Sequence, residues 1–227
     1  MFIDDVNISF KYSKNELVKK WLKNYPKSFR SKIKNILSIN SENAELDLEI
    51  SKCFNNCEKY YIIESNYDFY KDSIDKLFGK FNFKISYNDI LDYEIDPYLS
   101  YDLIIFFNNL GQDILSLIKK SFELMSNKGK IFIISCKGNE FLIDLRKYFN
   151  LNFLFDYEFK EKLNFDCKIF NTHIPNYINL KNLTKDELLK LTNINLDNNK
   201  IKQFKKYANK KYGEHVCVPV SIIILSK

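Results

Sequence analysis

The chain has 227 residues, of which 45% are hydrophobic, and it contains 20 Phe and 15 Tyr. This much aromatic surface has to be buried, so the composition excludes a disordered chain and favours a single globular domain. The formal net charge is +6, but basic and acidic residues alternate nearly everywhere, and the only dense basic stretch runs from Lys200 to Lys211. The charge pattern therefore disfavours nucleic acid as the main partner.

The cysteines and the N-terminus indicate the compartment. The five cysteines lie mostly in or beside apolar runs, as reduced core thiols do. Cys53 and Cys57 have no second pair to complete a zinc site, so no metal is predicted. The N-terminus is acidic where a signal peptide would be basic, and no apolar run reaches the roughly 18 residues of a membrane span. We expect a cytoplasmic protein without a membrane partner.

Residues 1–32 are predicted to be a helical segment, because apolar residues recur at helical spacing up to Pro26 and a short helix follows. Strands and helices then alternate through residues 33–158. YDLIIFF, at 101–107, is apolar on both faces, as a central parallel strand must be. This order predicts an α/β fold, a Rossmann-like core with helices on both faces of a parallel sheet. The predicted strands are 33–39, 60–63, 81–87, 101–107, 130–135 and 152–157, and the helices are 44–53, 67–78, 114–125 and 139–149.

Residues 159–213 do not continue this alternation, which predicts an inserted cap with helices over 185–192 and 198–211. Residues 214–227 return to the core as its final strand, over 216–225. Pro219 within this strand favours a position at or near an edge. Upstream, Asn127-Lys128-Gly129 is expected to close the helix over 114–125.

Polar residues follow the predicted strands at their carboxyl ends, where ligands bind in doubly wound sheets. Asn40 to Ala44 follow the first strand, and Glu64 ends the second. Glu64 lies 21 residues after Asn43, near the spacing at which a carboxylate accepts ribose hydroxyls, although a residue here can also cap the next helix or face water. Asp89 follows the third strand, where it can accept from an adenine amino group or form an Asx turn.

Four segments resemble class I S-adenosylmethionine-dependent methyltransferases, and among them the histamine N-methyltransferases. IKNILSINSENAELDLEISK resembles that family's first strand, loop and helix, and YYIIES resembles its second strand. YDLIIFFNNLGQDILSLIKKSFELMSNKGKIFII resembles the fourth strand, long helix and fifth strand, and SIIIL the final strand. The resemblance implies a mostly parallel seven-stranded sheet with an antiparallel last strand, helices on both faces and a small cap insertion, and S-adenosylmethionine as cofactor.

The resemblance also implies the cofactor-binding residues. Glu64 would bind the ribose, Asp89 or Asp92 would border the adenine, and Phe107 and Asn108 would line the other side. The first loop departs from the family, because no glycine remains between Asn40 and Ala44, where glycines allow a tight turn and a close approach of the cofactor. The full set of implied cofactor-binding residues is Asn40, Ser41, Glu64, Asp89, Phe107 and Asn108.

The residues that would hold histamine have lost their match. The family's N-terminal carboxylate, which holds the amine, corresponds in this chain to a position between Ser13 and Asn15, and Glu16 is the next residue. The amide of the family's final strand corresponds to Cys217 or Val218. We therefore expect a small-molecule acceptor other than histamine, with an amine as the first candidate. His215, just before the last strand, and Glu16 are candidate catalytic residues, and His173 is a further candidate base, although such histidines are more often structural.

Two other functions remain open from the sequence. A methyltransferase-like protein that has lost catalysis would act by binding a ligand or a protein partner. A nucleic-acid methyltransferase would use the basic helix over 198–211 as its phosphate-binding face. Asn108-Asn109-Leu110-Gly111 stands where a base methyltransferase would carry an Asn-Pro-Pro-aromatic motif, which disfavours the nucleic-acid enzyme.

Overall fold

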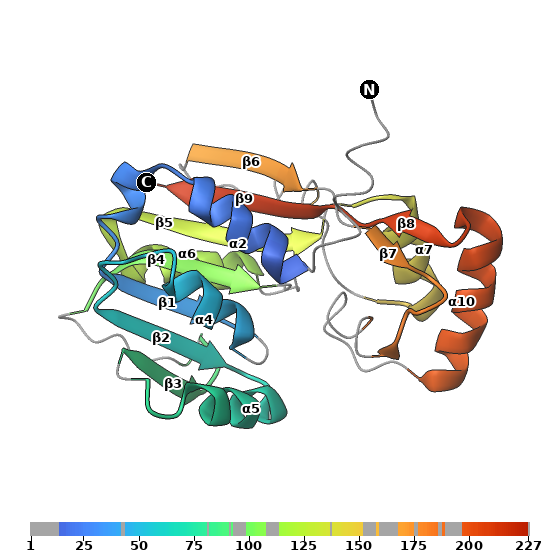
Figure 1. Cartoon of the computed structure of the whole chain (residues 1–227), viewed down its shortest axis with the longest axis horizontal. Coiled ribbons are helices and arrows are strands. Elements are labelled where there is room, and N and C mark those ends of the chain that lie inside the picture. The colour runs from blue at the N-terminus through green and yellow to red at the C-terminus, as the bar shows by residue number, and fades with distance from the viewer. Residues whose placement is uncertain are drawn as a thin grey trace.

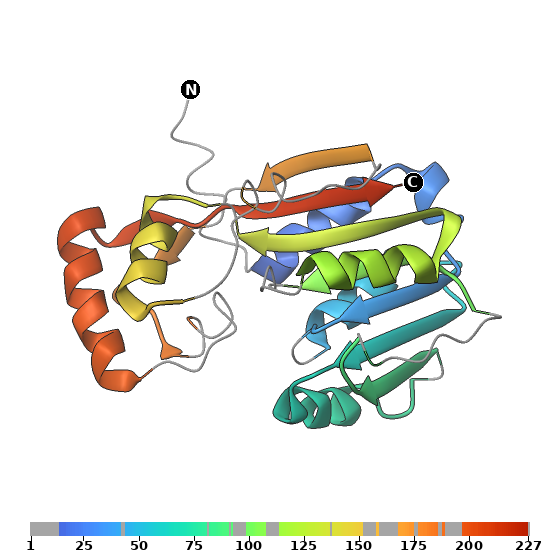
Figure 2. The same ribbon diagram turned by 180° about the vertical axis from the view of Figure 1, so that it is seen from behind.

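A seven-stranded sheet forms the centre of the molecule, and a smaller lobe lies beyond the carboxyl ends of its parallel strands (Figures 1 and 2). The computed structural model describes residues 14–41, 44–80, 82–90, 92, 99–107, 114–136, 138–151, 158, 168–174, 177–185, 188 and 197–226. Its helices are α2 (Lys14–Asn24), α3 (Lys27–Arg30), α4 (Glu45–Ser51), α5 (Tyr67–Leu77), α6 (Ile114–Leu124), α7 (Glu140–Phe149) and α10 (Asn198–Tyr212). Its strands are β1 (Asn35–Ile39), β2 (Lys59–Glu64), β3 (Phe83–Tyr87), β4 (Tyr101–Phe107), β5 (Met125–Cys136), β6 (Lys168–Ile174), β7 (Tyr177–Asn179), β8 (His215–Cys217) and β9 (Val220–Ser226).

The strand order of the main sheet is β3-β2-β1-β4-β5-β9-β6. The pairs from β3 through β5 are parallel, and β9 runs antiparallel to both of its neighbours. The predicted fold, a mostly parallel seven-stranded sheet with an antiparallel last strand, is therefore confirmed. The order reverses between β1 and β4, which is where ligands bind in open α/β sheets.

Both faces of the sheet are covered by helices. Successive side chains of a strand point to opposite faces, so neighbouring residues pack in different clusters. Ile36 of β1 packs in the cluster beneath α2 and α4, whereas its neighbour Leu37 packs in the cluster beneath α6. The central strand β4 follows the same rule, with Leu103 in the first cluster and Ile104 in the second. This double burial explains why the central strands are apolar throughout.

Asp102 aligns three strands at the edge of the sheet opposite the candidate site. Its Oδ2 accepts hydrogen bonds from the backbone N–H groups of Lys34 (2.9 Å) and Asn35 (3.1 Å). Its Oδ1 accepts one from the hydroxyl of Ser126 (3.0 Å). One carboxylate thus connects the start of β4 with the starts of β1 and β5, which helps to fix the relative positions of their carboxyl ends.

The smaller lobe has a hydrophobic cluster of its own. Phe141 and Leu145 of α7 pack with Ile201 and Phe204 of α10 and with Val218. Helix α7 therefore belongs to the lobe, although its sequence had suggested a helix on the sheet. Strand β6 belongs to the main sheet, although it lies within the range 159–213 that we assigned to the cap.

The end of the chain differs from the predicted single strand over 216–225. Pro219 separates two strands: β8 pairs with β7 in a two-stranded sheet, and β9 enters the main sheet. The expected position of Pro219 at or near an edge is confirmed, because β8 belongs to a two-stranded sheet and β9 is next to the edge strand β6. The proline precedes β9, where its missing N–H interrupts no ladder. The predicted strand over 152–157 and most of the helix over 185–192 lie outside the described residues.

The connection between α6 and β5 also differs from its prediction. Asn127-Lys128-Gly129 does not close the helix, because α6 ends at Leu124 and β5 begins at Met125. The register against β4 shifts here, from Tyr101 opposite Met125 to Leu103 opposite Lys130. The glycine accommodates a close approach of the chains, since a Cβ at position 129 would lie 2.9 Å from the backbone oxygen of Tyr101.

We predict that Gly129→Ala destabilises the protein by about 1–3 kcal/mol, the usual range for overpacking a buried position. The new methyl group would lie 2.5 Å from Cγ of Met125 as well as against the backbone. Urea unfolding measures the change, with the exposed neighbour Lys128→Ala as the control, for which we expect less than about 0.5 kcal/mol. Equal effects of the two substitutions would contradict the close approach at Gly129.

Candidate cofactor site

Asn40 joins the carboxyl ends of β1 and β2. Its backbone N–H donates to the carbonyl of Ile63 (2.9 Å), and its side-chain Oδ1 accepts from the N–H (3.2 Å) and the hydroxyl (3.0 Å) of Ser65. Its φ is 54°, a left-handed conformation that asparagine adopts more readily than most residues. Asn40 can therefore make the turn that would otherwise favour glycine.

Ala44 is the second left-handed residue of this loop, with φ 57° and ψ 5° at the N-cap of α4. It is fully buried. An alanine in this conformation costs about 1–2 kcal/mol relative to right-handed backbone. The glycine-free loop thus begins and ends in conformations that glycine adopts without strain, while Glu42 and Asn43 lie outside the described residues.

We predict that Ala44→Gly changes the free energy of unfolding by less than about 1 kcal/mol. Relief of the left-handed strain is offset by the added freedom of the unfolded chain, about 0.4–1 kcal/mol, and by the lost buried methyl, about 0.8 kcal/mol. Ala44→Val should instead lose more than about 2 kcal/mol, because a β-branched residue tolerates this backbone poorly and the site is full. Chemical denaturation of both variants tests the loop geometry, and an Ala44→Val protein as stable as wild type would contradict it.

A buried polar cluster lies under the loop. Asp47, in the first turn of α4, is fully buried, and its Oδ1 accepts a 2.6 Å hydrogen bond from the hydroxyl of Tyr60 on β2. Burial raises the pKa of Asp47, while the nearby hydroxyls of Ser38, Ser41 and Tyr60 lower it. Oδ2 of Asp47 and the two serine hydroxyls are buried without a well-aligned hydrogen bond. Ser41 belongs to the loop, so the cluster connects α4 and the sheet to the candidate site.

We predict that Asp47→Asn becomes more stable relative to wild type as the pH rises. In wild type the folded-state pKa of Asp47 is raised, so stability is lost as the pH rises from about 4, the unfolded value, through the folded value. Asparagine keeps an acceptor for Tyr60 and carries no charge. Unfolding at a series of pH values measures the difference, with Asp75→Asn on the exposed face of α5 as control. A difference that stays constant or shrinks with rising pH would contradict the buried carboxylate.

Glu64 ends β2 with its side chain almost entirely buried (2% exposed). Its Oε1 accepts from the N–H of Asn66 (3.0 Å), and its carbonyl accepts from the N–H of Asn88 (3.2 Å) at the end of β3. Asn66 in turn caps α5. The Glu64 carboxylate thus supports the start of α5, as one interpretation of the sequence expected, and it does not face water. Its binding to a ribose stays a prediction.

The remaining predicted cofactor residues differ in exposure. Asp89 is exposed at the end of β3, and its N–H donates a hydrogen bond to Oδ1 of Asn88 (2.9 Å). Asp92 is also exposed. Phe107, the last residue of β4, is 3% exposed and packs in the cluster beneath α2 and α4. Asn108 lies outside the described residues.

The two candidate catalytic residues lie in different places. Glu16 is exposed in the first turn of α2, and that end of the helix lies at the carboxyl edge of the sheet (Figure 1). His215 is exposed at the start of β8, directly after α10, with Nε2 3.2 Å from Nδ2 of Asn179. The structure thus brings Glu16 toward the strand ends and leaves His215 in the lobe. His173 lies in β6 of the main sheet.

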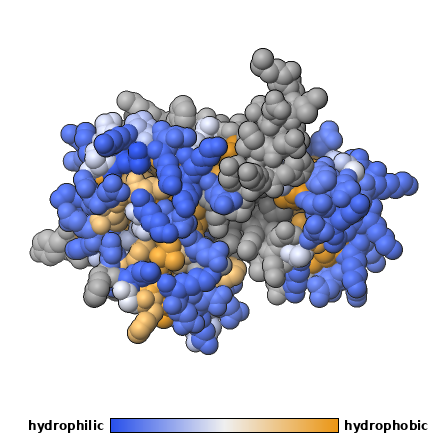
Figure 3. Space-filling view, in the orientation of Figure 1, coloured by the Kyte–Doolittle hydropathy of each residue, from blue (hydrophilic) through white to orange (hydrophobic). Residues whose placement is uncertain are grey.

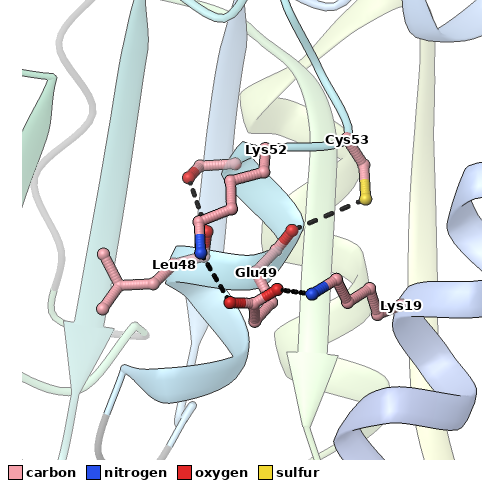
Figure 4. A network of polar contacts seen from close by, with 6 residues as sticks. Lys19, Leu48, Glu49, Lys52 and Cys53 are labelled. Atoms are coloured by element: carbon pink, nitrogen blue, oxygen red, sulfur yellow. Dashed lines mark hydrogen bonds and ion pairs between the residues drawn. The ribbon is translucent and has the colours of Figure 1, made fainter.

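A polar network fixes α2 against α4 (Figure 4). Glu49 of α4 forms ion pairs with Lys19 of α2 and with Lys52 (2.6 Å). The hydrogen bonds from these two lysines lower the pKa of the Glu49 carboxyl, and the thiol of Cys53 donates to its backbone oxygen (3.5 Å). This network therefore holds α2, which carries Glu16, to the helix that follows the glycine-free loop.

Within the residues that the structure describes, no group of three or more His, Cys, Asp and Glu is placed to hold a metal ion. None of the described helices is long and apolar enough to cross a membrane. Cys53, Cys57 and Cys217 form no disulfide among the described residues, and burial raises the pKa of Cys57 to about 11.

The strand order and the antiparallel interior strand β9 define a Rossmann-like class I methyltransferase fold. A putative methyltransferase from Bacillus halodurans has a TM-score of 0.63 at 9% identity, covering 91% of this chain and 96% of that chain. The plantazolicin methyltransferase BpumL, in complex with SAH, has a TM-score of 0.58 at 15% identity, covering 94% and 84%. Coclaurine N-methyltransferase, bound to N-methylheliamine and SAH, has a TM-score of 0.55 at 15% identity, covering 91% and 71%. No protein-family model matches the sequence, and no curated protein matches it.

Proposed function

We propose that this protein is an S-adenosylmethionine-dependent methyltransferase that acts on a small molecule, with an amine as the first candidate for the acceptor. The observation that carries the proposal is the buried carboxylate of Glu64 at the end of β2, beside the loop that Asn40 ties to Ser65. In this fold a carboxylate at that position accepts the ribose hydroxyls of a nucleoside. The structural neighbours include enzymes that bind SAH in the same fold.

The proposed cofactor residues divide into a nucleoside half and an amino-acid half. Glu64 would accept the ribose hydroxyls, and exposed Asp89 would border the adenine. Asn40 and Ser41 would lie against the amino-acid part, where the left-handed backbone of Asn40 supplies the turn. Phe107 and Asn108 would line the remaining side. This division leaves the nucleoside half close to the usual pattern and puts the departures in the glycine-free loop.

Bound S-adenosylmethionine would supply an electrophilic methyl group to an acceptor held in line with it. An unprotonated amine would form the new C–N bond as the methyl–sulfur bond breaks, so that S-adenosylhomocysteine would leave, and the resulting ammonium group would lose a proton to solvent or to a nearby base. Such transfer depends mainly on positioning and on an unprotonated acceptor. Glu16, at the start of α2, is the candidate to accept a hydrogen bond from the amine N–H and so orient its lone pair. His215 stays a prediction as base, and histamine is not expected as the acceptor.

The rival proposal is a methyltransferase-like protein that binds a ligand or a protein partner without catalysis. The observation that favours it is the left-handed backbone at buried Ala44. A side chain at a position that favours glycine is poorly suited to a close cofactor contact. A cofactor affinity too weak to measure would support this rival. Measurable affinity without turnover of any amine would support a binding role that keeps the cofactor.

We predict that S-adenosylhomocysteine and S-adenosylmethionine bind in calorimetric titration, about tenfold to a hundredfold more weakly than expected for a glycine-rich loop, a loss of about 1–3 kcal/mol. Glu64→Gln should weaken binding at least about tenfold, because it removes the charge that accepts the ribose hydroxyls but keeps an acceptor for the N–H of Asn66. Glu64→Ala should abolish most of the remaining affinity.

Glu58→Gln is the matched control, because Glu58 is exposed just before the opposite end of the same strand and pairs only with exposed Lys34 among the described residues. Its affinity should equal that of wild type. Thermal unfolding of each variant separates lost binding from lost folding. No binding at millimolar concentration, or equal affinity of wild type and Glu64→Ala, would overturn the proposed function.

A further inference from the structure

The net charge of the chain is concentrated in one helix. Helix α10 contains six lysines and no acidic residue. The chain has 35 basic and 29 acidic residues in total, so the rest of the chain has 29 of each and is formally neutral. The alternation of charges that disfavoured a nucleic-acid partner therefore breaks down at α10, which lies at the outer end of the lobe, away from the sheet (Figures 1 and 2).

The lysines of α10 form a row on its solvent face. Lys202, Lys206 and Lys210 recur every four residues, so they lie on one side of the helix. All three are exposed, and none forms an ion pair with another described residue. The acidic residues nearest in sequence are already engaged, since Asp197 caps the helix and Glu214 pairs with Lys181 (2.8 Å). This face is hydrophilic in the space-filling view (Figure 3).

Two exposed tyrosine rings lie beside the lysine row. Tyr207 of α10 is 42% exposed and Tyr148 of α7 is 41% exposed, and their rings are stacked with centroids 6.3 Å apart and planes at 21°. Asp144, the acidic residue next to them, is neutralised by Lys211 (2.6 Å) and by the hydroxyls of Tyr207 and Tyr212. These hydrogen bonds lower the pKa of Asp144 to about 2. The surface therefore offers a row of cations next to a pair of aromatic rings.

We infer that this face, formed by Lys202, Lys206, Lys210, Tyr148 and Tyr207, binds single-stranded nucleic acid. Lysines in a row match the spacing of a phosphate backbone, and unpaired bases stack on exposed aromatic rings. A membrane surface fits less well, because the apolar side of α10, with Ile201, Phe204 and Ala208, is buried against the lobe and cannot insert into lipid. This site is separate from the proposed cofactor site and does not depend on it.

The test uses the full chain and a fluorescein-labelled single-stranded RNA of about 12 nucleotides, read by fluorescence anisotropy between about 50 and 200 mM salt. We expect binding that weakens with salt. The triple variant Lys202→Gln, Lys206→Gln, Lys210→Gln should bind at least about tenfold more weakly and show a salt slope about 2 units shallower, at about 0.7 per phosphate contact. Tyr148→Leu should lose at least about fivefold in affinity, because it removes one stacking surface.

Two matched variants serve as controls. Lys59→Gln, Lys80→Gln, Lys128→Gln removes the same charge from three exposed positions outside the lobe, and Tyr67→Leu removes a tyrosine that is 51% exposed on α5. Both should bind RNA as wild type does. The inference is overturned if RNA does not bind at the lowest salt or if either control loses as much affinity as its partner variant. Equal binding of a poly-glutamate peptide, or binding of phosphatidylserine vesicles without RNA binding, would also overturn it.

Discussion

The hydrogen bond between Tyr60 and Asp47 is the interaction on which the candidate site depends. It joins the helix after the glycine-free loop to β2, whose last residue is Glu64, and it does so inside the protein. A buried carboxylate is costly unless hydroxyl groups satisfy it. The hydroxyls of Ser38 and Ser41 lie beside it, one from the strand before the loop and one from the loop. The loop, the helix and two strands therefore meet at one buried acid.

This arrangement explains how left-handed backbone is held on both sides of a loop that has no glycine. The left-handed backbone at Asn40 is stabilised by two hydrogen bonds from Ser65 to its side chain. The left-handed backbone at Ala44 is held by complete burial. Strain of this kind persists only where the surroundings determine the conformation. Asp47 and its neighbours supply part of those surroundings, and the pair formed by Lys19 and Glu49 adds a second support from α2.

Much of the core could be predicted from the sequence because its signals are local. The segment YDLIIFF predicted both ends of β4 correctly, since both of its faces are apolar. The position of Glu64 at the end of the second strand was also predicted correctly. The burial of Asp47 was not predicted, because an aspartate between Leu46 and Leu48 in a helix is typical of a solvent-facing position. Its burial depends on how α4 is oriented over Tyr60, which is a contact between segments distant in sequence. The predicted end of α6 and the predicted single strand over 216–225 were wrong for the same reason, because strand pairing decided both.

The lobe was the part least accessible to sequence patterns. The helix α7 has the amphipathic pattern of a helix that covers a sheet. Its place in the lobe follows from its contacts there, which include Phe204 and Ile201 of α10, and not from its sequence. The charges of α10 and its own Tyr207 were visible in the sequence, but Tyr148 comes to lie beside them only when α7 packs against α10. The molecule thus has two polar regions of different character, a carboxylate-rich edge of the sheet and a lysine-rich outer helix.

The most direct test of the account is a titration of the isotopically labelled protein with S-adenosylhomocysteine, followed by amide chemical shifts in two-dimensional NMR. The account predicts that the largest shifts occur at Asn40, Ser41, Glu64, Ser65 and Asp89, at the carboxyl ends of β1, β2 and β3. Amides of α7 and α10 should stay unchanged. Shifts confined to the lobe, or no shifts at millimolar ligand, would contradict the assignment of the cofactor site to the glycine-free loop and the end of β2.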